Sequence, residues 1–177
     1  MICMQRKCLL SIGVLVLFAH VAATQEAGKI SISGPAVQNT QFSGDELAKM
    51  PCLSIEVHDS HTSQLCRYEG VRVSDLLSRV GVPVGGALKG KAMATYVVAR
   101  AADGYSVVYS LAELDPAMNG NQIIVADRMN GTPLDKEQGS FRVIVPGEKR
   151  PARWIRMLTS SEVLSAVTPS GSLPPSP

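Results

Sequence analysis

A cluster of cations near the C-terminal end is the first segment whose residue types suggest chemistry. Lys149, Arg150 and Arg153 follow directly after the apolar run 141–145. Cations this close together can converge on one anion, and arginine holds a phosphate or carboxylate through paired N–H groups. Pro151 lies among them and supplies no backbone N–H. Two interpretations remain open at this stage, an anion-binding loop and a solvated basic turn.

Aromatic and imidazole side chains provide the next candidates. Trp154 follows the basic run, where its ring can stack on a flat ligand or anchor the core. His58 and His61 lie three positions apart in a polar stretch, with Asp59 between them. Imidazoles bind zinc or copper, but a structural zinc site needs about four ligands, and the sequence does not indicate the others. A surface turn is the alternative for this histidine pair.

The cysteines do not form a recognisable catalytic or metal-binding motif. Cys52 and Cys66 lie within the body of the chain, and their spacing is wider than Cys-x-x-Cys. A disulfide between them would stabilise the fold by about 3 kcal/mol in the chain-entropy model. They flank a predicted hairpin whose register the sequence does not fix, so the disulfide remains an open question. The sequence shows neither a Ser/His/Asp arrangement nor a Gly-x-G-x-x-Gly phosphate loop.

The N-terminal segment has the features of an export signal. Arg6 and Lys7 precede an apolar run over 9–19, and small residues end at Ala23. The apolar stretch is shorter than the roughly 20 residues of a membrane-spanning helix. We therefore predict a signal peptide over 1–23, with cleavage after Ala23 and a periplasmic or secreted protein that has no membrane segment after signal removal.

Removing the signal changes the charge balance of the chain. The full sequence has 17 Lys+Arg and 15 Asp+Glu, so loss of Arg6 and Lys7 leaves the two signs equal. Aromatic residues make up only 5% of the chain. A neutral domain with few aromatic rings lacks both the basic face and the stacking surface of a nucleic-acid-binding protein. The sequence therefore excludes nucleic acid as an expected partner.

The elements that must position these residues are short strands and a few short helices. Alternating apolar residues predict strands over 29–33 and 53–57, and a hairpin joins 93–99 to 105–109. Apolar residues at helical spacing predict a helix over 73–80. The mixture predicts an α+β fold. We expect one domain over 29–164 and a disordered Ser- and Pro-rich tail over 168–177.

Three stretches, in this order and spacing, carry a resemblance to a known family. They are 68–77 with its aromatic-x-Gly-Val step, 102–114 with its Asp-Gly turn, and 139–156 with its Pro-Gly turn and Arg-Trp pair. Together they resemble the molybdopterin-binding domain of the sulfite oxidase superfamily over residues 29–164. The resemblance implies mixed β-sheets with short helices. It also implies molybdopterin as a cofactor to be tested.

The resemblance further implies which residues would meet that cofactor. In the family's enzymes a cysteine thiolate ligates molybdenum, and soft sulfur suits that metal better than imidazole does. The family's spacing, counted back from Gly70, places His58 at this position, with Cys66 as a displaced alternative. Cofactor contacts are expected from His58, Lys149, Arg150, Arg153 and Trp154. No catalytic residue and no metal ligand is assigned.

Two possible functions follow from the presence of histidine where the family has its cysteine ligand. In the first, the protein binds a pterin-type or other anionic small ligand, or supports a redox system, without the usual cysteine ligand. In the second, it is a cofactor-free periplasmic module that binds a protein partner on the same scaffold. The sequence leaves enzymatic activity open, because its fold resembles an oxidoreductase while the expected cysteine position is occupied by histidine.

Overall fold

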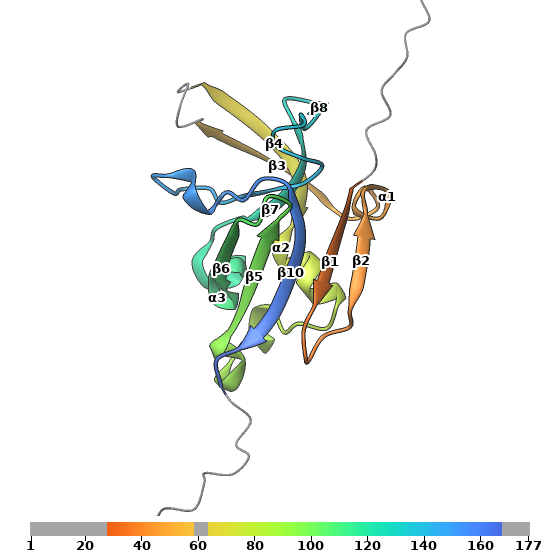
Figure 1. Ribbon diagram of the computed structural model, residues 1–177. Coiled ribbons are helices and arrows are strands. Elements are labelled where there is room, and N and C mark those ends of the chain that lie inside the picture. Colours follow the sequence, from red (N-terminus) through yellow and green to blue (C-terminus); the bar gives the residue numbers. More distant parts are fainter. Residues whose placement is uncertain (1–27, 59–63, 168–177) are drawn as a thin grey trace, which may run out of the picture.

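The computed structural model describes residues 28–58 and 64–167 (Figure 1). These residues form two five-stranded sheets with short helices at their edges and connections. The predicted signal peptide, the tail over 168–177 and His61 lie outside the described residues. Within residues 28–58 and 64–167, no helix combines the length and the apolar character needed to cross a membrane.

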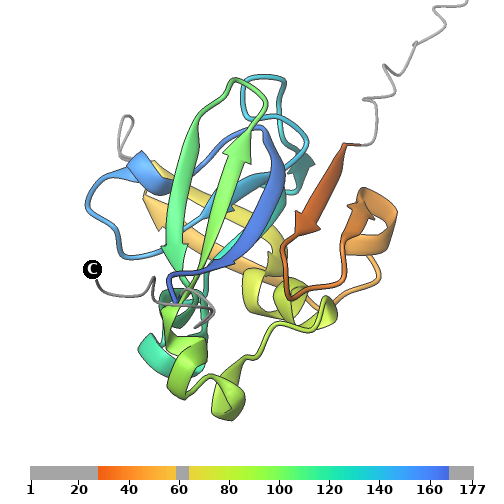
Figure 2. The same cartoon turned by 60° about the horizontal axis from the view of Figure 1, so that its bottom comes forward.

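The first sheet joins the two ends of the described chain. Its order is β2 (Thr40–Ser43), β1 (Lys29–Ser33), β10 (Leu158–Ser165), β5 (Thr95–Ala101) and β6 (Ser106–Ser110). β1 and β10 are parallel, whereas the other neighbours are antiparallel. Figure 2 shows β10 lying between β1 and β5. The last strand therefore forms the centre of this sheet.

The second sheet carries most of the site described below. Its order is β3 (Cys52–His58), β4 (Leu65–Arg72), β7 (Ile124–Met129) and β8 (Thr132–Pro133), and β9 (Arg142–Ile144) also pairs with β7. The β3–β4 hairpin extends away from the body of the molecule in Figure 1. All of its pairings are antiparallel.

Short helices connect the strands. They are α1 (Gly44–Leu47), α2 (Val73–Arg79), α3 (Leu111–Leu114), α4 (Pro116–Asn119), and the 3-10 turns η1 (Gly85–Ala87), η2 (Gly90–Ala94) and η3 (Pro151–Arg153). Ser43 and Ser110 each begin a helix with a reciprocal capping box, through Glu46 and Glu113. Such a box satisfies two backbone N–H groups that a helix start leaves unpaired.

The core draws on both sheets and on the helices between them. Ile30 from the first sheet, Ile124 and Ile144 from the second, and Leu76 and Leu77 from α2 are almost fully buried. The 3.6-residue spacing predicted for 73–80 therefore directs leucines inward, as expected for an amphipathic helix. Burial of such side chains is the main force holding the two sheets together.

Gly70 permits close approach of two strands in the second sheet. A Cβ atom at this position would lie 2.0 Å from the Val125 carbonyl oxygen and 2.6 Å from the Ala126 Cα. The β4–β7 register also shifts between Glu69 and Gly70. A side chain here would therefore force the strands apart. This explains the glycine in the aromatic-x-Gly-Val step.

The structure confirms the predicted α+β class, the hairpin between β5 and β6 and the helix after Gly70. It adds β2 and α4, which the sequence analysis did not predict.

The structure also resolves the question of a disulfide between Cys52 and Cys66. Cys52 pairs with Val71, whereas Cys66 pairs with Val57. Since Val57 lies five positions after Cys52 on β3, the two cysteines are separated by about 16 Å along the hairpin. A disulfide requires Cα atoms within about 7 Å, and both cysteines are free.

Candidate functional site

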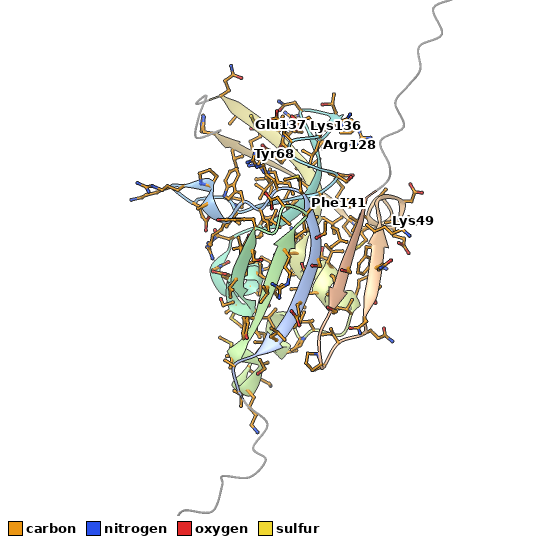
Figure 3. All side chains as sticks on the ribbon, in the orientation of Figure 1. Lys49, Tyr68, Arg128, Lys136, Glu137 and Phe141 are labelled. Atoms are coloured by element: carbon orange, nitrogen blue, oxygen red, sulfur yellow. The ribbon has the colours of Figure 1, made fainter. Side chains whose placement is uncertain are left out.

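A cavity of about 550 Å³ lies between the second sheet and the segment 146–157, which we call the strap. Its size is within the range of roughly 300–1,000 Å³ typical of small-molecule sites. The lining residues from the sheet and its loops are His58, Gln64, Cys66, Tyr68, Met129, Asn130, Asp135, Glu137, Gln138 and Arg142. The strap contributes Glu148, Pro151, Ala152, Trp154 and Arg156. Tyr68 and Glu137, labelled in Figure 3, lie at the same end of the molecule.

Arg142 is the central cation of the cavity wall. Its Nη1 donates hydrogen bonds to the Tyr68 hydroxyl at 3.1 Å and to Gln138 Oε1 at 2.8 Å. Its guanidinium carbon lies 5.3 Å from the Tyr68 ring centroid and 5.8 Å from that of Trp154. Both distances are within the range of a cation–π contact. Arg142 therefore connects the second sheet to the strap.

The two aromatic rings pack against each other as well. Tyr68 and Trp154 meet edge to face, with centroids 6.5 Å apart and ring planes at 89°. Trp154 is only 9% exposed, and its Nε1 is buried with no hydrogen-bond partner in the described part of the chain. A buried donor of this kind is costly unless a ligand or water satisfies it. Trp154 is thus both a core residue and a polar feature of the cavity wall.

The loop before β9 places Gln138 against Arg142. The Asp135 carboxylate accepts hydrogen bonds from the Gln138 backbone N–H at 2.9 Å and side-chain amide at 3.3 Å. The backbone hydrogen bond lowers the pKa of Asp135. Gly139 follows with a positive φ, and a Cβ there would lie 2.6 Å from the Met157 Cα. The close approach of loop and strap at this point fixes one end of the cavity.

Arg153 faces two carboxylates rather than the cavity. Its Nη1 donates to both Glu113 oxygens at 3.0 Å, its Nε donates to Glu148 Oε1 at 2.6 Å, and its Nη2 also contacts that oxygen. The guanidinium lies over the Tyr109 ring, 5.5 Å from its centroid. Burial opposes the charged form, yet hydrogen bonds to Glu113 and Glu148 raise the pKa of Arg153. This arginine is held in place as part of the framework.

The five predicted contact residues are therefore not gathered in one place. His58 and Trp154 line the cavity, as does Cys66, the alternative to His58. Lys149 and Arg150 are exposed and are not among the residues that line it. Arg153 is ion-paired beside the cavity.

The cavity residues that the sequence analysis missed include Tyr68, Gln138 and Arg142, which form the hydrogen-bonded centre of its wall. Tyr68 and Arg142 lie inside the stretches that carry the family resemblance, so the signal was present but was assigned only to the fold. Gln138 precedes the third stretch and carries no such signal. Among residues 28–58 and 64–167, no three His, Cys, Asp or Glu side chains are grouped to hold a metal ion.

With the cavity described, the sequence can be compared with known proteins. The family model described as the oxidoreductase molybdopterin binding domain matches residues 19–170. The chain belongs to this family. The membership confirms the resemblance inferred from the ordered motifs, and the mixed sheets agree with the predicted fold.

A solved structure shows the same fold as this member of the molybdopterin-binding-domain family. The sulfane dehydrogenase SoxCD from Paracoccus pantotrophus superposes with a TM-score of 0.60 at 19% sequence identity. The match covers 77% of this chain but 38% of the SoxCD chain. No curated protein matches the sequence. The likeness to SoxCD therefore concerns the fold of one part of that chain.

The residues present can be tested against the cofactor that the family name implies. Tyr68, Arg142 and Trp154 belong to the cavity lining, and the buried Trp154 Nε1 is a donor without a partner in the described part of the chain that a heterocycle could satisfy. At the phosphate end, Lys149 and Arg150 lie outside the cavity lining and Arg153 is bound to two carboxylates, so Arg156 is the strap arginine that lines the cavity. The cations expected from the resemblance therefore do not form a phosphate site in this cavity.

Proposed function

We propose that this family member is an exported binding protein that takes a small, flat, polar ligand of the pterin type in the cavity beneath the strap. In this proposal the protein binds its ligand without metal-dependent turnover. The export step rests on the predicted signal peptide. The absence of turnover rests on His58 at the position where the resemblance places a cysteine ligand.

The observation that carries the proposal is the layer formed by Tyr68, Arg142 and Trp154. These side chains come from β4, β9 and the strap and are joined by two cation–π contacts. Fixed aromatic rings with a few convergent polar groups are the usual lining of a small-molecule site. Because Tyr68 is 2% and Trp154 9% exposed, a flat heterocycle would meet this layer mainly through Arg142, whose guanidinium can bind the carbonyl groups of the ligand.

The binding test uses a phosphate-free probe, pterin-6-carboxylate, and isothermal calorimetry on protein comprising residues 24–177. We expect saturable binding by the native protein. Replacing Arg142 by Met should weaken it by about tenfold or more, since one charge-assisted hydrogen bond contributes roughly 1.5–3 kcal/mol. Arg100→Met is the matched control, because Arg100 pairs with Glu162 on the other sheet. Absence of binding by native protein at millimolar probe would contradict the proposal.

The catalytic side is tested separately. Protein purified from the periplasm of molybdate-fed cells is expected to contain molybdenum far below one atom per chain and to leave sulfite unoxidised with an artificial electron acceptor. Stoichiometric molybdenum together with oxidation of sulfite would overturn the non-catalytic part of the proposal.

A second candidate function is a periplasmic protein-binding module. The β3–β4 hairpin favours it, because the hairpin extends from the body and exposes 55% of Leu65. A photo-crosslinking residue at position 65 should then yield one defined adduct in the periplasm. The same residue at Met118, which is 44% exposed on α4, is the control. Equal labelling at both positions would argue against this function.

A further inference from the structure

We infer that Glu113, Glu148 and Arg153 form a closed ion-pair triad that keeps Arg153 from binding phosphate and makes the end of the cavity beside Glu148 unfavourable for a phosphate group. The inference concerns the ligand class of the proposed binding site. It rests on the proposed function only in taking the ligand to be a flat heterocycle. The exclusion of phosphate follows from the triad itself.

Most hydrogen-bond donors of Arg153 are already used. A guanidinium has five N–H groups, and here Nε, Nη1 and Nη2 make four hydrogen bonds to carboxylate oxygens of Glu113 and Glu148. A phosphate could bind Arg153 only by displacing these bonds. It would then leave two half-buried carboxylates without their cation. The free energy lost by leaving such a charge unpaired is larger than the free energy gained by forming the ion pair.

The sign of the local charge also opposes phosphate. Two carboxylates surround one guanidinium, so the triad has a net charge of −1 at neutral pH. Its side chains are partly shielded from solvent, with exposed fractions of 27% for Glu113, 20% for Glu148 and 39% for Arg153. Screening by salt and water is weaker for such groups than at the open surface. A phosphate beside Glu148 would therefore be repelled by the triad; Arg156, the exposed arginine of the strap lining, lies outside the triad.

The triad is held by elements that do not depend on a ligand. Glu113 is fixed by its capping box, in which its Oε1 accepts from the Ser110 backbone N–H at 2.8 Å. Arg153 is supported from below by the Tyr109 ring, and its carbonyl oxygen accepts a hydrogen bond from the Tyr109 hydroxyl. The guanidinium therefore has a defined position between α3 and the strap. It is not a flexible arginine available to solvent anions.

Glu148 extends the triad into the cavity wall. Its Oε1 accepts from Arg153, whereas its Oε2 is buried and has no hydrogen-bond partner in the described part of the chain. A buried carboxylate oxygen accepts hydrogen bonds and cannot donate when ionised. This end of the cavity therefore suits a ligand amino or amide N–H group and disfavours an oxyanion.

The experiment removes the two negative charges while keeping their shapes. Native protein, Glu113→Gln/Glu148→Gln and the control Glu162→Gln are titrated with inorganic phosphate and with pyrophosphate, with melting temperature and calorimetry as readouts. Glu162 is the control because it also pairs with an arginine, at 2.9 Å, but on the first sheet. Glu113→Gln alone is the second variant if the double variant does not fold.

We expect phosphate and pyrophosphate to leave native protein and the control unchanged. The double variant should bind them at least tenfold more tightly than native protein, and Glu113→Gln should bind with intermediate affinity, because Arg153 then regains charge and donors. Stabilisation of native protein by millimolar phosphate would overturn the inference. A folded double variant that gains no phosphate affinity would overturn it too.

These outcomes are distinct from those of the proposed function. If pterin-6-carboxylate fails to bind but the variants gain phosphate affinity, the proposed ligand is wrong and the triad is correct. If the probe binds and native protein also binds phosphate at the same site, the ligand class inferred from the triad is wrong and the proposed function remains.

Discussion

Replacing Arg142 by Met should destabilise the protein well beyond the loss of a surface charge. The change removes the hydrogen bonds to Tyr68 and Gln138 and the two cation–π contacts. Tyr68 and Gln138 are both buried, so their polar atoms lose a partner that water replaces poorly. Together these contributions amount to about 3 kcal/mol. For a domain of this size the melting temperature should fall by about 10 °C.

Thermal unfolding followed by circular dichroism measures this effect. Tyr68→Phe removes only the hydroxyl and should cost about 1 kcal/mol. Arg100→Met breaks the exposed pair with Glu162 and should cost no more than about 1 kcal/mol. If Arg142→Met and Arg100→Met lower the melting temperature equally, Arg142 does not connect the sheet to the strap and the reasoning is refuted.

Three further predictions concern other parts of the fold. Cys52 and Cys66 should both titrate as free thiols in unfolded protein of residues 24–177, and a reductant should leave the melting temperature unchanged; a drop of several degrees would reveal a disulfide. Burial raises the pKa of Asp127, so its ionised form is less favourable in the folded state than in the unfolded state. Asp127→Asn should therefore raise the melting temperature at pH 7. This gain should disappear as the pH falls through the raised pKa of folded Asp127 toward the ordinary value of 3.8, because the carboxyl is then protonated in both states. A gain that is independent of pH would contradict this. Gly70→Ala should yield little folded protein because its Cβ would meet the Val125 carbonyl, whereas Gly86→Ala, where φ is not positive and a Cβ meets nothing within 4 Å, should express normally; equal yields would refute the close-approach argument.

The sequence predicted the fold class well because local signals determine most of its elements. Alternating residues in β3 and helical spacing in α2 are properties of a few neighbouring positions. β2 was missed because Thr40–Ser43 is short, and α4 because its four residues make only one turn, although Asp115 and Pro116 form a helix-start signal. These elements depend on tertiary contacts more than on local pattern.

The site was harder to predict, for a physical reason visible at Arg153. Three nearby cations satisfy a motif for anion binding, but charge alone does not say which acceptor each cation meets. The acceptor of Arg153 includes Glu113, 40 positions away in the sequence. Likewise, Arg142 meets Tyr68 from a position 74 residues distant. Contacts between side chains so far apart in the sequence depend on the topology of the fold, and no local spacing of residues predicts them.

The central place of β10 has a consequence for how the protein reaches its folded state. Ser31 Oγ donates to the Thr159 carbonyl oxygen, 128 positions away, and β10 separates the β1–β2 hairpin from the β5–β6 hairpin. During synthesis the N-terminal end of the chain appears first, so both hairpins can form early. They cannot join into one sheet until β10, which ends at Ser165, has been synthesised. Non-local contacts of this kind slow folding, because the closure entropy of a long loop is lost before the contacts form. The growing chain therefore remains incompletely folded, and accessible to chaperones and proteases, until almost the whole domain has been synthesised.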